Sequence, residues 1–256
     1  MTPGASVAGM DLQLSDRVAL VVGGKGYIGA AVVDRLRAEG ATVVVASRSA
    51  SDDEGAGMSE AGTSGAATSG AATSAVAMDT ADQASVDAGV ARVLAEHGRI
   101  DVLVVTAAPS ARTLDPAKRS DPEQVAQAVD GKALGFLRVA NAVLPAQRDA
   151  GFGRVVVVSG QNAYLSGNIT ASLRNTAVTV IAKNLADEVA GSGVTVNVVN
   201  PGTVTDDPSA EVQRGAGGES SPTQIADLVA FLSSPLSVVS GESISIAHRV
   251  LGSIVI

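Results

Sequence analysis

The sequence contains no cysteine and no tryptophan, and it has only two histidines, His97 and His248. The absence of cysteine excludes disulfides, thiolate metal sites and a thiol nucleophile. Because the two histidines are far apart in the chain, a histidine-based metal cluster is not expected, and we predict no metal site. Aromatic residues make up only 2% of the chain, which argues against stacking platforms for single-stranded nucleic acid.

Basic charge and long apolar runs are also scarce. The 18 lysine and arginine residues are outnumbered by 26 acidic residues, so the net charge is −8. This balance argues against a nucleic-acid partner, although it is compatible with a local basic pocket. No apolar run reaches the ~18 residues that a bilayer-spanning helix needs, and the first ten residues do not resemble a signal peptide. We therefore expect a soluble, cytoplasmic protein that acts on a small molecule, with no membrane partner.

The chain is rich in short runs of valine and isoleucine that alternate with helical patterns. These runs are continuous rather than alternating, as expected of strands buried on both faces of a parallel sheet. They lie at 17–22, 42–46, 75–78, 101–106, 154–158, 194–199 and 243–247. Alternating strands and helices predict an α/β fold, a Rossmann-type doubly wound parallel β-sheet of about seven strands flanked by helices. We expect a single domain over 12–256, preceded by a flexible extension, 1–11.

Two long segments have apolar residues at helical spacing, Glu123–Gln147 and Asn175–Ala190. Between the second and third strands, a low-complexity segment at about 50–75 contains "TSGAATSGAATS", which disfavours a helix. We interpret this segment as a mobile surface loop, either a disordered insertion or a functional lid. A second glycine-rich stretch, Arg214–Ser221, is placed where a substrate loop would be useful.

A glycine motif joins the first strand to a helical segment. Gly23, Gly26 and Gly29 form G-x-x-G-x-x-G within "VVGGKGYIGAAVV". Glycine permits a tight turn and lets the backbone approach a pyrophosphate, which then lies at the N-terminus of the following helix. A purely structural turn is the alternative, but the strand before and the helix after the motif favour dinucleotide binding.

The end of the second strand carries no acidic residue to accept the ribose 2′-hydroxyl of NAD. Ser47 and Arg48 stand there instead and offer a hydroxyl and a guanidinium, which suit a 2′-phosphate. Lys25 adds a second cation in the glycine loop. The pattern predicts NADP (NADPH) as the cofactor.

With these motifs in place, the chain resembles the short-chain dehydrogenase/reductase family from about Leu12 to its end. "MDTAD", "TAAPS", "NPGTV" and the closing "TQIADLVAFLSS" follow in the family's order. The resemblance implies that Asp79 contacts the adenine and that the Pro-Gly turn lies against the nicotinamide. The implied cofactor-binding residues are Gly23, Lys25, Gly26, Ile28, Gly29, Ser47, Arg48, Asp79, Ala107, Pro201, Gly202 and Val204.

The family's catalytic tyrosine and lysine are not evident. The resemblance implies a serine that polarises the substrate oxygen, a tyrosine that transfers the proton, and a lysine four residues later on the same helix face. Alignment on "AKNLADEVA" puts Ala171 and Asn175 at the tyrosine and lysine positions, and no Tyr-x-x-x-Lys occurs elsewhere. Ser159 stands at the serine position, and Lys132 replaces a helper asparagine.

We name Ser159, Tyr164 and Lys132 as candidate catalytic residues. Tyr164 follows Ser159 closely and would be an alternative proton donor, or it is a packed loop residue. Lys132 would supply a cation, or it lies on a solvated or cofactor-facing helix surface. A substrate with an acidic hydroxyl of its own is a further source of the proton.

Three functions remain open at this point. The first is an NADP-dependent ketoreductase with a non-standard proton source, acting on a secondary-metabolite or polyphenolic carbonyl compound. The second is a catalytically silent homologue that serves as a cofactor-binding partner subunit or regulator. The third is a non-redox cyclase or dehydratase that uses the same cleft. We also expect a homo-oligomer, a dimer or tetramer, or a hetero-oligomer with an active paralogue, because the two long helices resemble those through which the family dimerises.

Overall fold

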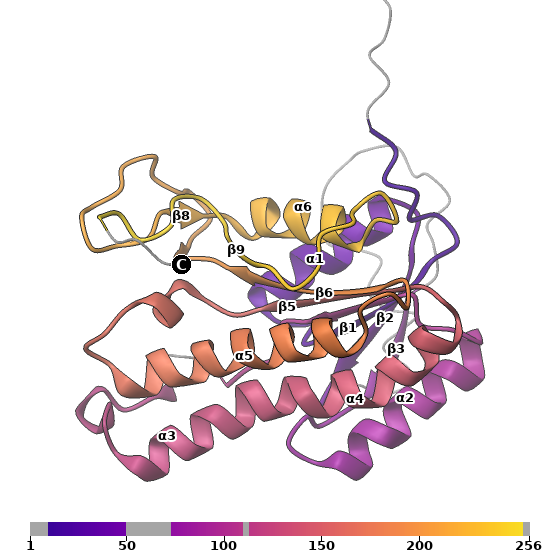
Figure 1. Cartoon of the computed structure of the whole chain (residues 1–256), viewed down its shortest axis with the longest axis horizontal. Coiled ribbons are helices and arrows are strands. Elements are labelled where there is room, and N and C mark those ends of the chain that lie inside the picture. Colours follow the sequence, from indigo (N-terminus) through magenta and orange to yellow (C-terminus); the bar gives the residue numbers. More distant parts are fainter. Residues whose placement is uncertain (1–9, 50–72, 110–112, 253–256) are drawn as a thin grey trace, which may run out of the picture.

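The computed structural model describes residues 10–49, 73–109 and 113–252, which build one parallel sheet of seven strands with helices on both faces (Figure 1). The strand order is β3-β2-β1-β4-β5-β6-β9. The strands are β1 (Val18–Val22), β2 (Thr42–Ser47), β3 (Thr73–Ala77), β4 (Val102–Val105), β5 (Gly153–Val158), β6 (Val194–Asn200) and β9 (Ser243–Ser245). A short pair, β7 (Thr203–Val204) and β8 (Glu219–Ser220), forms a second sheet. The predicted doubly wound fold is therefore confirmed.

The central strands are buried on both faces, as their unbroken valine runs predict. Every residue of β1, β4, β5 and β6 is buried. Neighbouring strands pair in parallel register, so Leu20 of β1 lies opposite Val44 of β2 on one side and Leu103 of β4 on the other. Helices must cover both faces of such a sheet, since neither face can be exposed to water.

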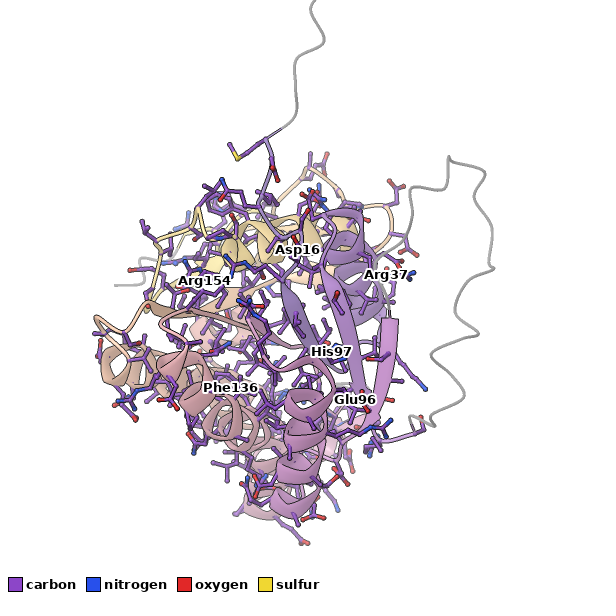
Figure 2. All side chains as sticks on the ribbon, turned by 90° about the vertical axis from the view of Figure 1, so that its right-hand side faces the viewer. Asp16, Arg37, Glu96, His97, Phe136 and Arg154 are labelled. Carbon is purple, nitrogen blue, oxygen red and sulfur yellow. The ribbon has the colours of Figure 1, made fainter. Side chains whose placement is uncertain are left out.

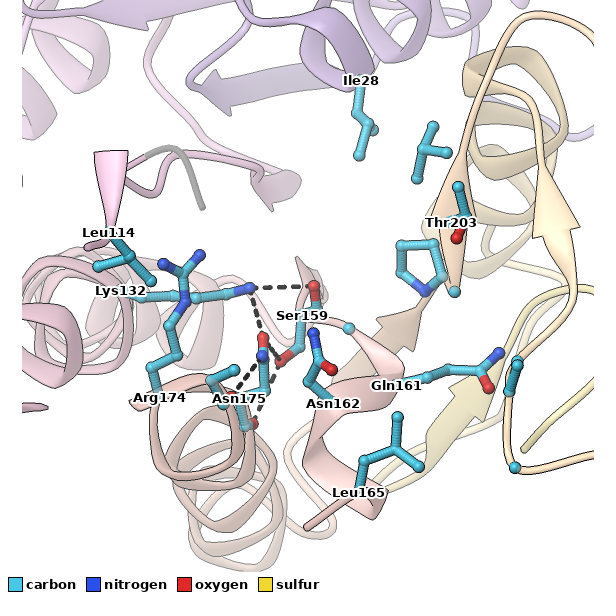
Figure 3. A pocket seen from close by; sticks show the side chains of 18 residues that line it. Ile28, Leu114, Lys132, Ser159, Gln161, Asn162, Leu165, Arg174, Asn175 and Thr203 are labelled. Atoms are coloured by element: carbon cyan, nitrogen blue, oxygen red, sulfur yellow. Dashed lines mark hydrogen bonds between the residues drawn. The ribbon is translucent and has the colours of Figure 1, made fainter. Parts of the chain in front are cut away.

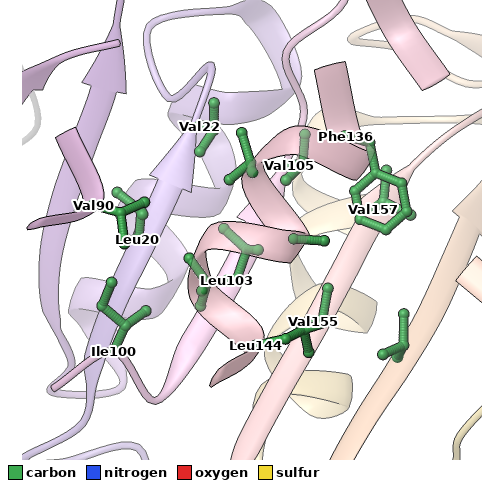
Figure 4. Close-up of a cluster of buried hydrophobic side chains, with 14 of the residues drawn as sticks. Leu20, Val22, Val90, Ile100, Leu103, Val105, Phe136, Leu144, Val155 and Val157 are labelled. Atoms are coloured by element: carbon green, nitrogen blue, oxygen red, sulfur yellow. The ribbon is translucent and has the colours of Figure 1, made fainter. Parts of the chain in front are cut away.

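Helices α1 and α6 cover one face of the sheet, and α2, α4 and α5 cover the other (Figure 1). On this second face Phe136 of α4 packs against the strands together with Val105 and Val157 (Figure 4). The helices are α1 (Tyr27–Ala38), α2 (Gln83–His97), α3 (Pro122–Val129), α4 (Gly135–Asp149), α5 (Ile169–Glu188) and α6 (Pro222–Ser233). Short 3₁₀ turns occur at η3 (Pro116–Lys118) and η5 (Gln161–Tyr164).

Charged side chains lie mainly at the periphery of this layered core. Figure 2 shows Asp16 and Glu96 at the surface, whereas Phe136 lies among the helices. Arg154 is an exception, since it is buried at the start of β5 and donates hydrogen bonds to the backbone oxygens of Gly153, Gly193 and Ser234. A buried arginine whose Nε and Nη1 donate to three backbone oxygens serves as a structural support.

The two predicted long helices differ in detail from what the sequence indicates. The predicted Glu123–Gln147 helix is α3 followed by a π-helical turn, η4 (Asp130–Leu134), and then α4. The predicted Asn175–Ala190 helix begins earlier, at Ile169, because the Asn168 side chain caps it by accepting a hydrogen bond from the Ala171 N–H at 2.9 Å.

Some predictions concern residues outside the described ranges. The extension, 1–11, is described only from Met10 onward, and most of the low-complexity loop, 50–72, lies outside the described residues. Its predicted end at about 75 is a little too late, because β3 already begins at Thr73. Among the described residues, no helix is both long enough and apolar enough to cross a membrane.

Candidate active site and cofactor cavity

The carboxyl ends of the strands meet at one edge of the sheet, where parallel α/β folds bind their ligands. From β1 the chain adds β2 and β3 on one side of the sheet and then β4, β5 and β6 on the other side, so the strand order reverses between β1 and β4. The chain after β1 leads to α1 on one face of the sheet, and the chain after β4 leads to α4 on the opposite face. Two cavities open at this edge. They border on each other, since Gly131 lines one and its neighbour Lys132 lines the other.

The glycine loop between β1 and α1 is packed too tightly for side chains. Gly23 has φ +87°, and a Cβ there would lie 2.6 Å from the Ala107 nitrogen. A Cβ on Gly29 would lie 2.1 Å from the Gly23 carbonyl oxygen. Gly29 lines neither cavity, so its role is to let α1 approach the loop. This is the close strand–helix approach that a dinucleotide-binding turn needs.

The N-terminus of α1 offers binding capacity for an anion. Its N-cap is Gly26, no side chain caps it, and its first turn has no acidic residue. The first backbone N–H groups of a helix lack partners within the helix, and they carry the positive end of its dipole. Gly26 lines the larger cavity, so this helix end is placed to hold a phosphate.

The larger cavity has a volume of about 720 Å³ and lies over the ends of β1, β2, β3 and β4. Seven sequence-predicted cofactor residues line it, namely Gly23, Lys25, Gly26, Ser47, Arg48, Asp79 and Ala107. The buried Ser47 Oγ has no hydrogen-bond partner among the described residues. An unpaired hydroxyl at this position, beside Arg48 and an uncapped helix N-terminus, fits a phosphorylated dinucleotide.

The smaller cavity, of about 390 Å³, lies beside the ends of β5 and β6. Four further predicted cofactor residues line it, Ile28, Pro201, Gly202 and Val204, as do Ala171 and Asn175. The glycine-rich stretch contributes Gly215, Ala216 and Gly217 to its wall. Backbone hydrogen bonds hold this stretch, from Gly215 N to Leu251 O at 2.9 Å and from Gly218 N to His248 O at 2.7 Å.

Lys132, Ser159 and Asn175 form a buried polar cluster in this smaller cavity (Figure 3). The Lys132 Nζ donates to the Ser159 backbone oxygen at 2.9 Å and to the Asn175 Oδ1 at 2.7 Å. The Ser159 hydroxyl lies 3.2 Å from the same Asn175 Oδ1, and the Asn175 Nδ2 donates to the Ala171 backbone oxygen at 2.7 Å. Lys132 sits in the π-helical turn η4, a local distortion that often marks functional positions.

Burial and, to a smaller extent, the nearby positive charge of Arg174 together lower the pKa of Lys132 to about 7. Within the described part of the chain, no aspartate, glutamate or histidine lines the smaller cavity to oppose this effect. An ammonium group with a pKa near neutrality exchanges its proton readily under physiological conditions, which is the property of an effective general acid.

The structure brings Lys132 and Ser159 together but places Tyr164 elsewhere. The Tyr164 hydroxyl lies 2.9 Å from the Ser243 Oγ and accepts a hydrogen bond from Asn200 Nδ2 at 3.1 Å. The Arg249 guanidinium lies over its ring at 5.1 Å from the centroid. Tyr164 does not line the cavity of Lys132 and Ser159, so we do not build a mechanism on it.

Sequence reasoning missed Arg174, which lines the smaller cavity from α5. Its position four residues before Val178 puts it in line with the buried stripe of Val178, Ala182 and Leu185. That spacing is the signal by which the sequence could have revealed a buried arginine. In the part of the chain that the structure describes, no group of three or more histidine, cysteine, aspartate or glutamate residues is arranged to hold a metal ion.

Comparisons with known proteins agree with this architecture. The family model described as short chain dehydrogenase matches residues 17–216. An acetoacetyl-CoA reductase of Rhizobium meliloti is 31% identical over 243 residues, which are 90% of this chain and 96% of the relative. The (2S)-[(R)-hydroxy(phenyl)methyl]succinyl-CoA dehydrogenase subunit BbsC of Thauera aromatica is 32% identical over 237 residues, 89% of this chain and 92% of the relative.

A solved structure shares the fold. The crystal structure of a short chain dehydrogenase from Mycobacterium smegmatis matches with a TM-score of 0.76 and 23% identity, and the match covers 97% of this chain and 98% of that chain.

Proposed function

Since the chain belongs to the short-chain dehydrogenase/reductase family, we propose that it is an NADP(H)-dependent reductase that protonates its carbonyl substrate from Lys132. The observation that carries this proposal is the buried Lys132 ammonium, which contacts Ser159 beside the dinucleotide cavity. In this proposal Ala171 and Asn175 stand where other family members have tyrosine and lysine. The cation then reaches the site from η4 rather than from α5.

The hydrogen bonds of Lys132 leave one proton for the substrate. A lysine ammonium has three N–H donors, and two of them bind the Ser159 oxygen and the Asn175 Oδ1. The third is available to a carbonyl oxygen in the cavity. A neutral amine retains two N–H groups, so Lys132 keeps both bonds after it gives up this proton. The geometry therefore tolerates either protonation state.

The reaction is a two-electron reduction of a carbonyl group to an alcohol. NADPH, held by the glycine loop, Ser47 and Arg48, would supply the hydride that forms the new C–H bond. Lys132 supplies the proton that forms the O–H bond, and solvent restores it. The Ser159 hydroxyl donates to Asn175 oxygens in this structure. In the proposed reaction it turns its hydrogen to the same substrate oxygen and orients the carbonyl group.

The relatives' names support a 3-oxoacyl compound as the substrate class to test first. The Rhizobium meliloti protein is named for the reduction of acetoacetyl-CoA, a 3-oxoacyl thioester. The experiment is to supply the purified chain with NADPH and a panel of 3-oxo esters, thioesters and acids, and to follow the loss of NADPH. Substrate-dependent oxidation of NADPH supports the reductase, and its absence across the panel contradicts it.

The cofactor preference is a separate prediction. Arg48→Ala should weaken NADPH binding about tenfold or more, because a charge-assisted hydrogen bond to the 2′-phosphate is lost. NADH binding should change little. Calorimetric titration with both cofactors measures this, with Arg92→Ala as the control, since Arg92 is an exposed arginine on α2 that pairs with Glu96. Equal affinities of the unmodified chain for NADPH and NADH would contradict the assignment.

A specific observation also favours the silent-subunit alternative. The Thauera aromatica relative is named as a subunit of a dehydrogenase, so a protein 32% identical to this chain works within a larger enzyme. If this chain has the same role, it should bind NADPH and show no turnover alone, yet gain turnover when co-expressed with a dehydrogenase encoded beside it. Turnover by the purified chain alone decides for the reductase.

We propose further that the chain is a homo-oligomer that associates through α5. Ile169, Leu173 and Val180 are 49%, 48% and 55% exposed and lie along one side of this helix. Leu173→Asp should therefore shift the chain toward the monomer in analytical ultracentrifugation, because it puts a charge into an apolar contact. Val238→Asp, at an exposed apolar position outside α5, serves as the control. A monomeric unmodified chain at all concentrations would contradict the proposal.

A further inference from the structure

Arg174 differs from Arg154, the other buried arginine among the described residues. It is only 6% exposed, yet its buried Nη1 has no hydrogen-bond partner among the described residues. Arg154 is equally buried, but it donates to three backbone oxygens. Leaving a buried charged donor unpaired is costly in free energy, so such a group calls for a partner that the protein itself does not supply.

Among the described residues, the cavity around Arg174 provides no negative charge. Arg174 lines the smaller cavity together with Lys132, and none of the described lining residues is acidic. Burial lowers the pKa of the Arg174 guanidinium, and Arg174 in turn contributes to the lowered pKa of Lys132. Two cations thus face one small cavity without a counter-ion, in a chain whose net charge is −8. An anionic ligand would relieve both the repulsion and the unpaired donor.

The cofactor does not account for this anion site. Its phosphate-binding features, Gly23, Gly26, Ser47 and Arg48, all line the larger cavity, and Arg174 lines only the smaller one. The smaller cavity also holds the Lys132 and Ser159 pair at which the carbonyl group is to be protonated. The anion therefore belongs to the molecule that carries the carbonyl group.

We propose that the substrate is an oxo acid, whose carboxylate pairs with Arg174 while its ketone oxygen lies at Lys132 and Ser159. A guanidinium fork matches a carboxylate with two parallel hydrogen bonds, and burial strengthens that pairing. The cavity volume of about 390 Å³ suits a small substrate of this kind. The glycine-rich wall is closely packed, since a Cβ on Gly217 would lie 2.3 Å from the Gln161 Oε1. This inference rests on the proposed reductase function and names its substrate class.

The test compares two probes that share the 3-oxo group and differ in charge, acetoacetate and its neutral methyl ester, which carries one additional methyl group. Each is titrated calorimetrically into the chain saturated with NADP⁺, so that no turnover disturbs the binding signal. Acetoacetate should bind about tenfold to a hundredfold more tightly than methyl acetoacetate, as expected when a buried charge-assisted hydrogen bond is made. Equal affinities, or tighter binding of the ester, overturn the proposal.

Arg174→Met removes the charge and approximately conserves the volume of the side chain. It should lower acetoacetate affinity by the same factor and leave ester affinity and NADP⁺ affinity unchanged. Arg148→Met is the control, because Arg148 is an exposed arginine on α4 paired with Glu188. A parallel change of both probes in Arg174→Met, with NADP⁺ affinity retained, overturns the proposal.

The same preparations separate the oxo-acid site from the reductase itself. Charge-selective, Arg174-dependent binding without NADPH oxidation upholds the oxo-acid site and contradicts the reductase. NADPH-dependent reduction of ester and acid with equal kcat/KM upholds the reductase and overturns the oxo-acid site.

Discussion

Lys132→Met is expected to lower kcat for carbonyl reduction by about 10²- to 10⁴-fold, the range that a positioned general acid contributes. Methionine has nearly the length of lysine but no proton to give, and it cannot donate to the Ser159 oxygen or the Asn175 Oδ1. The cavity of the glycine loop is lined by other residues, so NADPH binding should persist.

The comparison requires a lysine that is remote from the site. Lys183→Met provides it, because Lys183 is an exposed residue of α5 that pairs with Asp187. Steady-state rates of both variants and calorimetric titration with NADPH separate a loss of chemistry from a loss of cofactor. If Lys132→Met retains the unmodified rate while it binds NADPH normally, another group protonates the substrate, and the proposed mechanism fails.

A triple variant with Ala171→Tyr, Asn175→Lys and Lys132→Asn is expected to gain reduction of simple activated ketones, by about tenfold or more over the unmodified chain. The unmodified chain should reduce these ketones only slowly, because they lack the carboxylate that pairs with Arg174 in the proposed substrate. The Lys132 Nζ lies 2.7 Å from the Asn175 Oδ1, so the two side chains hold one cation between them. Adding a second lysine at 175 alone would bring two ammonium groups into contact. The exchange at 132 and 175 retains one cation and moves it to the helix that carries the new tyrosine.

The gain should need all three changes, since a tyrosine is a poor proton donor near neutral pH without a cation to lower its usual pKa of about 10. The double variant with Ala171→Tyr and Asn175→Lys is the matched comparison, and it should be less active and less stable than the triple variant. A tyrosine that overpacks the cavity would cost about 1–3 kcal/mol of unfolding free energy. A folded triple variant that binds NADPH and reduces no ketone would contradict the assignment of positions 171 and 175.

The fold was predictable because its strands are visible in the sequence as short runs of valine. The valine runs of β1, β5 and β6 differ clearly in composition from the segments around them. Continuous apolar runs of this kind are typical of strands in a parallel sheet that is covered by helices on both faces. The start of α5 was not predictable from apolar spacing, because its first residues owe their helical state to the Asn168 cap. A cap acts through one side chain and leaves no periodic pattern.

The candidate site was predictable where it depends on the backbone. Gly23 and Gly29 reveal their role because a side chain would collide with Ala107 or with the loop itself. Contacts between side chains are harder to foresee. Lys132 and Asn175 come from different helices, and only the packing of η4 against α5 brings them together. Tyr164 follows Ser159 closely in sequence, yet the turn η5 directs its hydroxyl to Ser243.

The central claim, that Lys132 supplies the proton, is tested most directly by the pH dependence of kcat/KM for carbonyl reduction, which reports the free enzyme's ionising groups. Burial holds the pKa of Lys132 at about 7, and Arg174 is the only other cation among the described residues that line its cavity. The account predicts that kcat/KM falls about tenfold per pH unit as the pH rises above about 7, because the ammonium is lost. A kcat/KM that stays constant between about pH 6 and about pH 9 would contradict it.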